Sequence, residues 1–312
     1  MHEHIAPTVY YFEVHLLYAS IVWLAAWLLT SISRASATTK YWIWVATSLN
    51  FILPLGAALD KIFSSHISWA KPLSAIGIVG VVVSENASLA MVLAAVWLLG
   101  ATLMFVRLSL RIRAEYRDAP ITAHHGALSP RLSLLAHGVP VRFADTRHSP
   151  AVSGVLHPHI SLPHGIDRLL SEQELSAVLI HELTHARRRD NLIRLLYELA
   201  LCALWFHPLV WIAGSRLALY RELSCDESVI QRARGSDLVS ALAKLANREE
   251  PPLLQATASS FLSHRLARLT TPQQHCVCLA ANSLLAAAFG AALLMSVLGT
   301  VAHTACCFIA RT

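Results

Sequence analysis

The chain has 312 residues, of which 55% are hydrophobic and only 14% are charged, and its mean hydropathy is positive at +0.51. Soluble domains carry about 25% charged residues, so the composition argues against an ordinary soluble protein and indicates a membrane protein. The net charge of +6 does not indicate direct nucleic-acid binding, because no basic patch interleaved with aromatic residues and no helix-turn-helix pattern stands out.

Four apolar segments are long enough to cross about 30 Å of hydrocarbon as helices. They predict transmembrane helices at residues 9–30, 41–59, 88–106 and 279–302. A shorter, glycine-containing run at 74–83 predicts a loop or a re-entrant segment. The first segment lacks a basic start and a small-residue cleavage site, so we do not expect a signal peptide.

These spans divide the chain into a membrane region at 1–106, a large inserted segment at 107–277, and the fourth span with a short tail at 278–312. Of the 25 lysines and arginines, four precede the inserted segment and one follows it, which leaves 20 within it. The positive-inside rule therefore predicts that this segment is cytoplasmic and that both termini lie outside.

Short strands are predicted within the inserted segment at 141–145 and 160–163, with Pro150 and Gly154 among the residues that mark turns between them. The edge strand of such a small sheet can pair with an extended peptide and hold it beside a catalytic group.

The next predicted element is a helix that carries the sequence H-E-x-x-H. Ser171 followed by Glu174 is the pattern of a capping box, which predicts the start of this helix. His181 and His185 then lie four residues apart on one helix face, where both imidazoles can bind one metal ion, and Glu182 lies beside them. This arrangement is typical of a zinc hydrolase, with zinc as cofactor and Glu182 as the catalytic base.

A third ligand is expected from a second helix at about 215–234. Glu222 and Asp226 lie four residues apart on one face of this helix. We predict that Glu222 is the third zinc ligand and that Asp226 accepts a hydrogen bond from a ligand histidine. Glu227 is the rival ligand. A purely structural alternative is that these carboxylates pair with neighbouring arginines.

The apolar segment at 191–213 is long enough to suggest another span. A single crossing, however, would place His181 and His185 on the opposite side of the membrane from Glu222, and the three could not share a metal ion. We therefore expect the segment to pack against the other spans or to lie in the cytoplasmic interface, with a break at Pro208.

The six cysteines do not follow the spacing of zinc fingers. Cys202 and Cys225 are expected to be small buried apolar residues. Cys306 and Cys307 are expected in the outer tail, and their role is left open.

Three motifs together resemble the BlaR/MecR antirepressor family of membrane metallopeptidases. They are HELTHARRRDN at 181–191, WFHPLVW at 205–211 and ELSCDE at 222–227. The resemblance implies a mainly α-helical protein, with a four-helix transmembrane anchor and a cytoplasmic α+β gluzincin-like zinc protease domain between the third and fourth helices. It also implies that His181, His185 and Glu222 are the zinc ligands and that Glu182 is the general base.

The resemblance further implies a multi-pass protein of the bacterial inner membrane. Members of this family respond to a signal by cutting a cytoplasmic winged-helix repressor, and often themselves. The best-known receptors carry a penicillin-binding sensor domain after the fourth span, whereas this sequence ends at Thr312. We therefore do not expect direct β-lactam sensing, and we expect the stimulus to act on the spans or loops or through a separate sensor partner.

The expected mechanism is hydrolysis by a zinc-activated water whose proton is taken by Glu182 and passed to the leaving amine. His207, Tyr220 and Arg221 are candidates for stabilising the oxyanion. One alternative is a membrane quality-control protease of the HtpX/Ste24 type, which the His207-Pro208 segment and the three preceding spans argue against. Another is a non-catalytic membrane transducer, which the intact Glu182 argues against.

Overall fold

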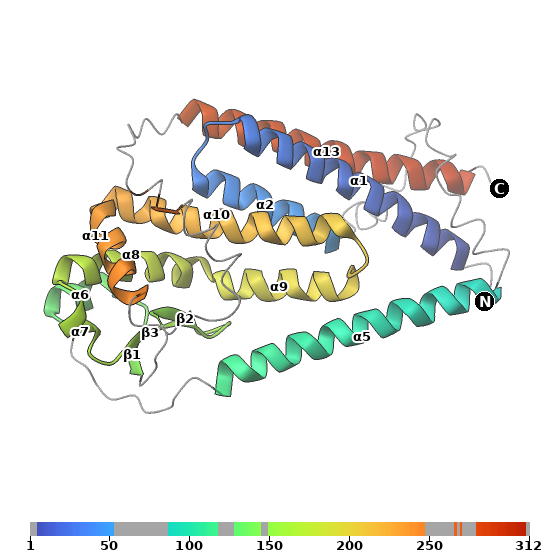
Figure 1. Ribbon diagram of the computed structural model, residues 1–312. Helices are drawn as coiled ribbons and strands as arrows, with labels where there is room; N and C mark the ends of the chain where they lie inside the picture. Colours follow the sequence, from blue (N-terminus) through green and yellow to red (C-terminus); the bar gives the residue numbers. More distant parts are fainter. Residues whose placement is uncertain are drawn as a thin grey trace.

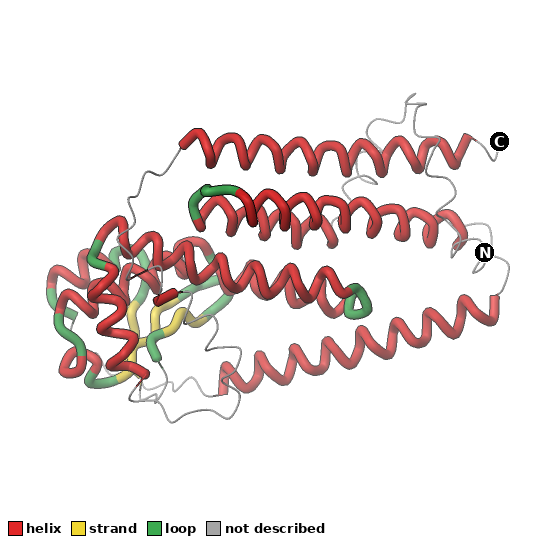
Figure 2. Tube along the Cα trace, turned by 45° about the horizontal axis from the view of Figure 1, so that its top comes forward, coloured by secondary structure: helices red, strands yellow, loops and turns green. Residues whose placement is uncertain are grey.

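The protein is mainly α-helical, with long helices arranged side by side and a small sheet with short helices at one end (Figures 1 and 2). The computed structural model describes residues 5–52, 87–117, 128–144, 149–246, 265–266, 269 and 279–309. The predicted re-entrant run at 74–83 lies outside these residues, and so do the side chains of Cys306 and Cys307.

Within the described residues, three helices are long and apolar enough to cross a membrane. They are α1 (Ile5–Ile32), α5 (Ala87–Arg117) and α13 (Leu279–Ile309). These helices coincide with the spans predicted at 9–30, 88–106 and 279–302. Residues 88–107 of α5 include none that is buried, as is expected of a helix that faces lipid. The three helices indicate a membrane protein.

Helix α2 (Ala37–Ile52) lies in the centre of the bundle and packs against α1, α9, α10 and α13. Tyr41 and Trp44 are fully buried there. The described part of α2 is 16 residues long, and residues 53–59 of the second predicted span lie outside the described part of the chain. The sequence after Ser36 therefore forms a helix that is enclosed by other helices, and its first turns lie against α10.

The apolar segment at 191–213 forms two helices joined by a short turn. The first helix ends before Pro208 and the second begins at it, so the segment is broken where the sequence predicted. Helix α9 (Asp190–Ala203) and helix α10 (Pro208–Arg232) run antiparallel, and Pro208 is the first residue of α10 (Figure 1). Tyr197 donates a hydrogen bond to the carbonyl of Val210 across the hairpin, at 3.1 Å. The prediction that the second helix begins near residue 215 was wrong. Proline is favoured at the first helical position, and the helix includes the apolar run that follows it.

The tip of this hairpin lies against the apolar stretch of α5. The indole of Trp97 on α5 donates to the carbonyl of Ala203 at 2.8 Å, and the indole of Trp205 donates to the carbonyl of Trp97 at 3.3 Å. A Cβ atom at Gly100 would overlap the Trp205 ring, so the glycine permits this close approach. The hairpin therefore packs against other candidate spans, as expected, and its two open ends lie at the same end of the bundle.

The sheet has three short strands in the order β1-β3-β2. Strand β1 (Val141–Ala144) pairs with β3 (His159–Pro163) in parallel, and β2 (Ala151–Ser153) pairs with β3 in antiparallel orientation. The two predicted strands are confirmed. The edge strand β2 was not predicted, because three residues between Pro150 and Gly154 are too few to show an alternating pattern. The short helices at this end are α6 (Pro130–Leu135), α7 (Ile166–Leu169) and α11 (Gly235–Ala246).

Helix α8 (Glu172–Arg188) begins with the predicted capping box between Ser171 and Glu174. The carboxylate of Glu174 also accepts a hydrogen bond from Ser240 and pairs with Lys244 at 2.8 Å, so it ties the start of α8 to α11. Arg189 caps the C-terminal end of α8, and its left-handed backbone (φ 56°) turns the chain directly into α9. These two ends fix the length of α8 and the direction in which α9 leaves it.

We predict that Glu174→Gln lowers the free energy of unfolding by about 1–2 kcal/mol, because the variant loses the charge that accepts these bonds. Hydrogen bonds from Lys244 and Ser240 lower the pKa of Glu174 from 4.5 to about 2. Since the folded-state pKa is the lower one, the ionised carboxylate stabilises the fold above pH 4.5, and this contribution is lost as the pH falls towards 2.

Thermal unfolding of the detergent-solubilised protein at several pH values checks this prediction. The difference between wild type and variant should shrink below pH 4.5. Glu172→Gln, in the same helical turn but exposed, is the matched control and should change little. A difference that stays constant down to low pH would show that the charge of Glu174 is not what stabilises this end of the helix.

Candidate metal centre

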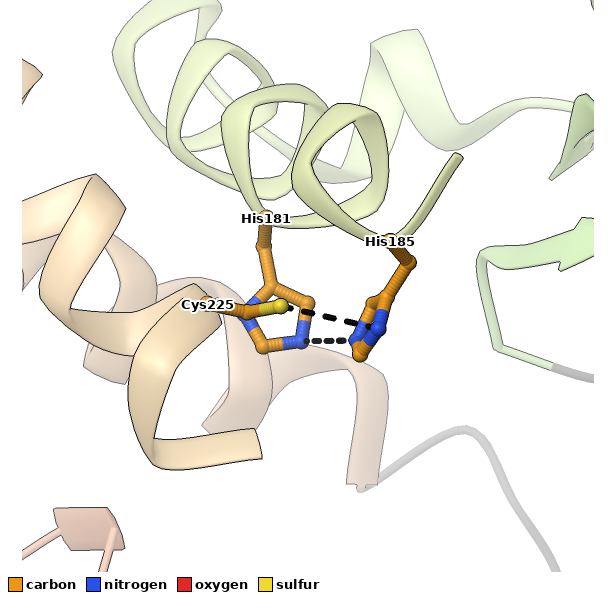
Figure 3. Close-up of side chains that lie close together, drawn as sticks. All are labelled: His181, His185 and Cys225. Carbon is orange, nitrogen blue, oxygen red and sulfur yellow. Dashed lines mark hydrogen bonds between the residues drawn. The ribbon is translucent and has the colours of Figure 1, made fainter. Parts of the chain in front are cut away.

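Two histidines of α8 face each other closely. His181 and His185 lie one helical turn apart, and their Nε2 atoms are 3.2 Å apart, with ring centroids separated by 4.9 Å (Figure 3). His181 is buried and His185 is half-buried. The helix therefore presents two imidazole nitrogens to one point, as the H-E-x-x-H spacing predicts.

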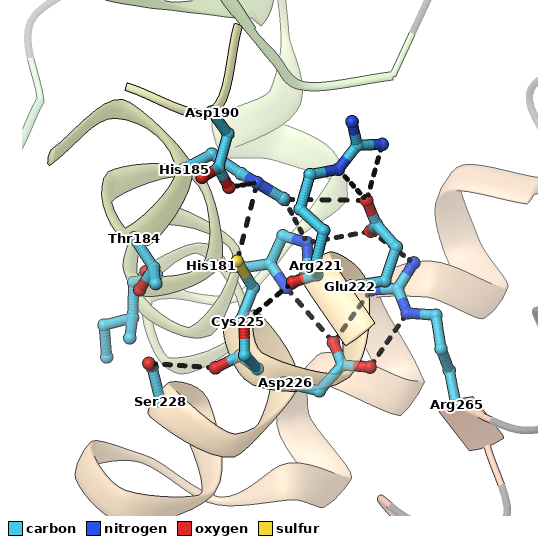
Figure 4. A network of polar contacts seen from close by, with 12 residues as sticks. His181, Thr184, His185, Asp190, Arg221, Glu222, Cys225, Asp226, Ser228 and Arg265 are labelled. Atoms are coloured by element: carbon cyan, nitrogen blue, oxygen red, sulfur yellow. Dashed lines mark hydrogen bonds and ion pairs between the residues drawn. The ribbon is translucent and has the colours of Figure 1, made fainter. Parts of the chain in front are cut away.

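Glu222 on α10 approaches the same point from the opposite side. Its Oε2 atom lies 3.5 Å from Nε2 of His181, and its Oε1 atom lies 3.8 Å from Nε2 of His185 (Figure 4). Zinc with bonds of 2.0–2.1 Å in a tetrahedron holds its ligand atoms about 3.3 Å apart. The two nitrogens and the carboxylate therefore have the composition and the spacing of a three-ligand zinc site.

Each histidine has a carboxylate behind it. Oδ1 of Asp226 lies 3.1 Å from Nδ1 of His181, so Asp226 is close to a histidine as expected, but the geometry is not that of the predicted hydrogen bond. Oδ2 of Asp190 lies 2.6 Å from Nδ1 of His185. A carboxylate at Nδ1 holds the proton on that nitrogen and leaves the Nε2 lone pair free for a metal ion. Asp190 was not predicted, although its sequence signal is an acidic residue immediately after the basic end of α8.

Two arginines in turn hold these carboxylates. Arg265 donates to both oxygens of Asp226 at 2.9 Å, and it also lies 3.6 Å from Glu222. Arg188 pairs with Oδ2 of Asp190 at 2.6 Å. Arg265 belongs to none of the predicted elements, and its place in the site was not predicted.

The negative side chains favour a cation at this point. Burial lowers the pKa of His181, but the carboxylates of Asp226 and Glu222 outweigh burial and raise the pKa to about 9. Burial would raise the pKa of Glu222, but the histidines and Arg221 hold it well below its ordinary value. A group of charges that stabilises a protonated imidazole also stabilises a bound metal cation.

Glu182 lies beside the histidines and lines the same cavity. Burial raises the pKa of its carboxyl, and this effect exceeds the opposing influence of His181 and His185. A carboxylate with a raised pKa is a stronger base than an ordinary glutamate, which suits a group that accepts a proton during catalysis.

Cys225 is a rival metal donor. Nitrogen atoms of His181 and His185 and the sulfur of Cys225 lie within 4.8 Å of one another. However, the sulfur lies 3.5 Å from Nδ1 of His185, on the side of the ring that Asp190 occupies, and it contacts Arg188. Burial raises the pKa of the Cys225 thiol well above its ordinary value, which disfavours the thiolate that binds metal. These contacts and the raised thiol pKa argue against Cys225 as a metal donor.

Glu227, the other rival, faces away from the histidines. Its carboxylate accepts hydrogen bonds from the backbone N–H of Thr38 at 3.1 Å and from the Thr38 hydroxyl at 3.0 Å, so it caps the start of α2. This contact gives Glu227 a structural role that the sequence did not reveal.

The three oxyanion candidates are placed very differently. His207 lies in the hairpin turn, 15 residues before Glu222, which corresponds to about 22 Å along a helix. Tyr220 is buried in the core of the helix bundle. Arg221 is the only one of the three among the described residues that line the cavity.

The cavity in front of the histidines has a volume of about 340 Å³. Strand β2 contributes Ala151 and Val152 to one wall, and α11 contributes Leu238, Leu242 and Leu245 to another. Asn191, next to Asp190, donates to the carbonyl of Val152 at 2.9 Å and so fastens β2 beside the histidines. The cavity thus joins a sheet edge, an apolar wall and the histidine pair.

Comparison with known proteins shows one family and several relatives. The family model described as BlaR1 peptidase M56 matches residues 12–269. The regulatory protein BlaR1 of Bacillus licheniformis is 31% identical over 129 residues, which cover 39% of this chain and 21% of that protein. The methicillin resistance mecR1 proteins of Staphylococcus aureus and Staphylococcus epidermidis are 24% identical over 93 residues, which cover 30% of this chain and 16% of those proteins. The matches thus span about a fifth of the length of these relatives or less.

We predict that the purified protein binds about one zinc ion per chain through two histidines and one glutamate. His181→Ala, His185→Ala and Glu222→Ala should each release most of the metal, measured by atomic emission after gel filtration. Glu172→Ala is the control for the loss of a carboxylate, because Glu172 is exposed and lies at the start of α8, away from the histidines. Full zinc occupancy in Glu222→Ala, with loss in Glu227→Ala, would mean that Glu222 is not the ligand.

Proposed function

Because this chain belongs to the BlaR1 peptidase M56 family, we propose that it is an integral-membrane zinc endopeptidase of the signal-transducing antirepressor type. The observation that carries the proposal is the position of Glu182 beside a histidine pair that Glu222 completes, within a cavity bounded by a strand edge. The three apolar helices support the membrane location.

We assign His181, His185 and Glu222 as the metal ligands and zinc as the metal. Two imidazoles and one carboxylate are the ligand set of many catalytic zinc sites, which keep a fourth position open. When bound there, zinc supplies a Lewis acid and a water of lowered pKa. Asp226 and Asp190 keep each histidine in the tautomer that offers Nε2 to the metal.

Glu182 acts as general base and then as general acid. Its carboxylate accepts a proton from the attacking water and later donates that proton to the amine that leaves when the peptide bond breaks. The raised pKa of Glu182 suits both steps, because a stronger base takes the proton more readily at neutral pH. Arg221 lines the cavity and is our candidate for stabilising the oxyanion.

The substrate binds as an extended peptide along β2. This strand is an edge of the sheet, and its residues line the cavity beside the histidines. An edge strand offers main-chain hydrogen bonds to a peptide of any sequence, and the apolar wall of α11 adds contacts to one of its side chains.

The proposed substrate is a cytoplasmic winged-helix repressor. The relatives are named as a regulatory protein and as methicillin resistance proteins. A regulatory peptidase whose active site faces the cytoplasm can reach and cleave a transcriptional repressor. Co-expression with such a repressor should yield discrete fragments, whereas a quality-control protease would instead degrade a misfolded membrane protein and leave the repressor intact.

For the membrane topology, we propose four spans at 9–30, 41–59, 88–106 and 279–302, with the peptidase domain at 107–277 on the cytoplasmic side of a bacterial inner membrane. The concentration of basic residues in 107–277 supports this orientation. The hairpin of α9 and α10 supports it too, because it returns Glu222 to the side on which His181 and His185 lie. The signal then reaches the peptidase through the membrane helices, their loops or a separate sensor partner.

We predict that Glu182→Gln keeps zinc but lowers the rate of repressor cleavage by about 10²–10⁴-fold or more, because an amide cannot accept the proton. Zinc content and cleavage rate are measured on the same preparation. Glu172→Gln, an exposed residue at the start of the same helix, should cleave like wild type. Near-normal cleavage by Glu182→Gln would exclude the proposed mechanism and favour a non-catalytic transducer.

The topology predicts which positions an impermeant thiol reagent can reach in intact cells. Cys306 and Cys307 are first replaced by serine, and single cysteines are then introduced. Cysteines at positions 123, 236 and 255 should be protected, and those at positions 65 and 312 should be labelled. Labelling at 236 with protection at 123 would mean that the chain crosses the membrane between these positions, and the assignment of Glu222 would fail with the topology.

A further inference from the structure

Helix α2 contacts the candidate metal centre through Tyr41. This residue is the first of the predicted second span, 140 positions before His181 in the sequence, and it is fully buried. Its hydroxyl donates a hydrogen bond to Oδ1 of Asp190 at 2.7 Å. Oδ2 of the same carboxylate lies 2.6 Å from Nδ1 of His185. Only one carboxylate therefore separates the membrane helix from a metal-binding imidazole.

The ring of Tyr41 is also fixed in place. The guanidinium of Arg188 lies over it, 4.3 Å from the ring centre, and the same guanidinium pairs with Asp190. A cation over an aromatic face is attracted by the ring. Arg188 further donates to Ser224 on α10, so Tyr41 lies where α2, α8, α9 and α10 meet.

The start of α2 is anchored to α10 independently. Glu227 of α10 accepts hydrogen bonds from Thr38, one turn before Tyr41. The backbone N–H of Ser36, just before α2, donates to the side chain of Asn282 on α13 at 2.9 Å. The position of the Tyr41 hydroxyl is therefore set by the packing of α2 and α13 as well as by the peptidase residues.

We propose that Tyr41 is a positioning residue for the metal centre: its hydroxyl holds Asp190 in the orientation that fixes His185, and the second membrane helix thereby sets the metal affinity of the site. This inference rests on the proposed zinc site. A carboxylate held by two donors has fewer orientations than one held by Arg188 alone, and groups that orient a metal-binding histidine commonly change metal affinity by 10–100-fold. A displacement of α2 reaches His185 through this hydrogen bond.

The test compares zinc affinity in the full-length protein. Tyr41→Phe removes the hydroxyl and keeps the ring under Arg188. Tyr197→Phe is the matched control, because it also removes a tyrosine hydrogen bond in the helix bundle, to Val210, but lies seven residues beyond Asp190 on α9. Zinc affinity is measured by competition with a chromophoric chelator, and the visible spectrum of the cobalt-loaded protein reports the geometry of the ligands. Thermal unfolding of the metal-free protein reports stability.

Tyr41→Phe should lower zinc affinity about tenfold and change the cobalt spectrum, while Tyr197→Phe keeps both. Equal zinc affinity in Tyr41→Phe and wild type would overturn the proposal. An equal loss of affinity in both variants would also overturn it, because the effect would then follow bundle stability. If wild type itself binds no zinc, it is the proposed function that fails, so the two failures are distinguishable.

Discussion

The site depends on one geometric constraint: α10 must return to α8 after α9 has led the chain away from it. His181 and His185 offer two nitrogens 3.2 Å apart, and the return of α10 brings the carboxylate of Glu222 to within 3.5 Å of the first and 3.8 Å of the second. The hairpin meets this constraint. Arg189 turns the chain at the end of α8, Pro208 starts the return helix, and Tyr197 closes the two helices on each other. The tip of the hairpin lies against α5, so the return path is supported by a candidate membrane helix.

The charged side chains around the histidines hold the imidazoles in place, and they are not an efficient way to stabilise the fold. Burying three carboxylates costs free energy unless each is paired, and replacing such networks by apolar residues often stabilises a protein. Here Asp226 is held by Arg265, Asp190 by Arg188 and Tyr41, and Glu222 by Arg221 at 3.2 Å. Each donor comes from a different part of the chain. The network therefore connects α8, α10, α2 and residue 265 to the two histidines. A displacement of any of these elements would move a group that contacts an imidazole or its carboxylate partner.

The sequence predicts the features that depend on neighbours in the chain, and it does not predict those that depend on distant contacts. The capping box at Ser171, the facing histidines and the break at Pro208 follow from spacings of a few residues, and the structure contains all three. The pairing of Asp226 with His181 was also predicted, because both belong to short motifs. Tyr41, Arg265 and the edge strand β2 were not. Tyr41 meets Asp190 across 149 residues, Arg265 meets Asp226 across 39 residues from outside the predicted elements, and β2 is only three residues long. No local pattern carries such information.

X-ray absorption spectroscopy of the zinc-loaded protein can identify the atoms that bind the metal. Zinc bonds to nitrogen and oxygen are about 2.0–2.2 Å long, whereas bonds to sulfur are about 2.3 Å. Coordination by His181, His185 and Glu222 predicts a first shell of nitrogen and oxygen alone, including the scattering pattern of two imidazoles. A zinc–sulfur distance that is abolished by Cys225→Ser and unaffected by Glu222→Ala would show instead that Cys225, and not Glu222, is the third ligand.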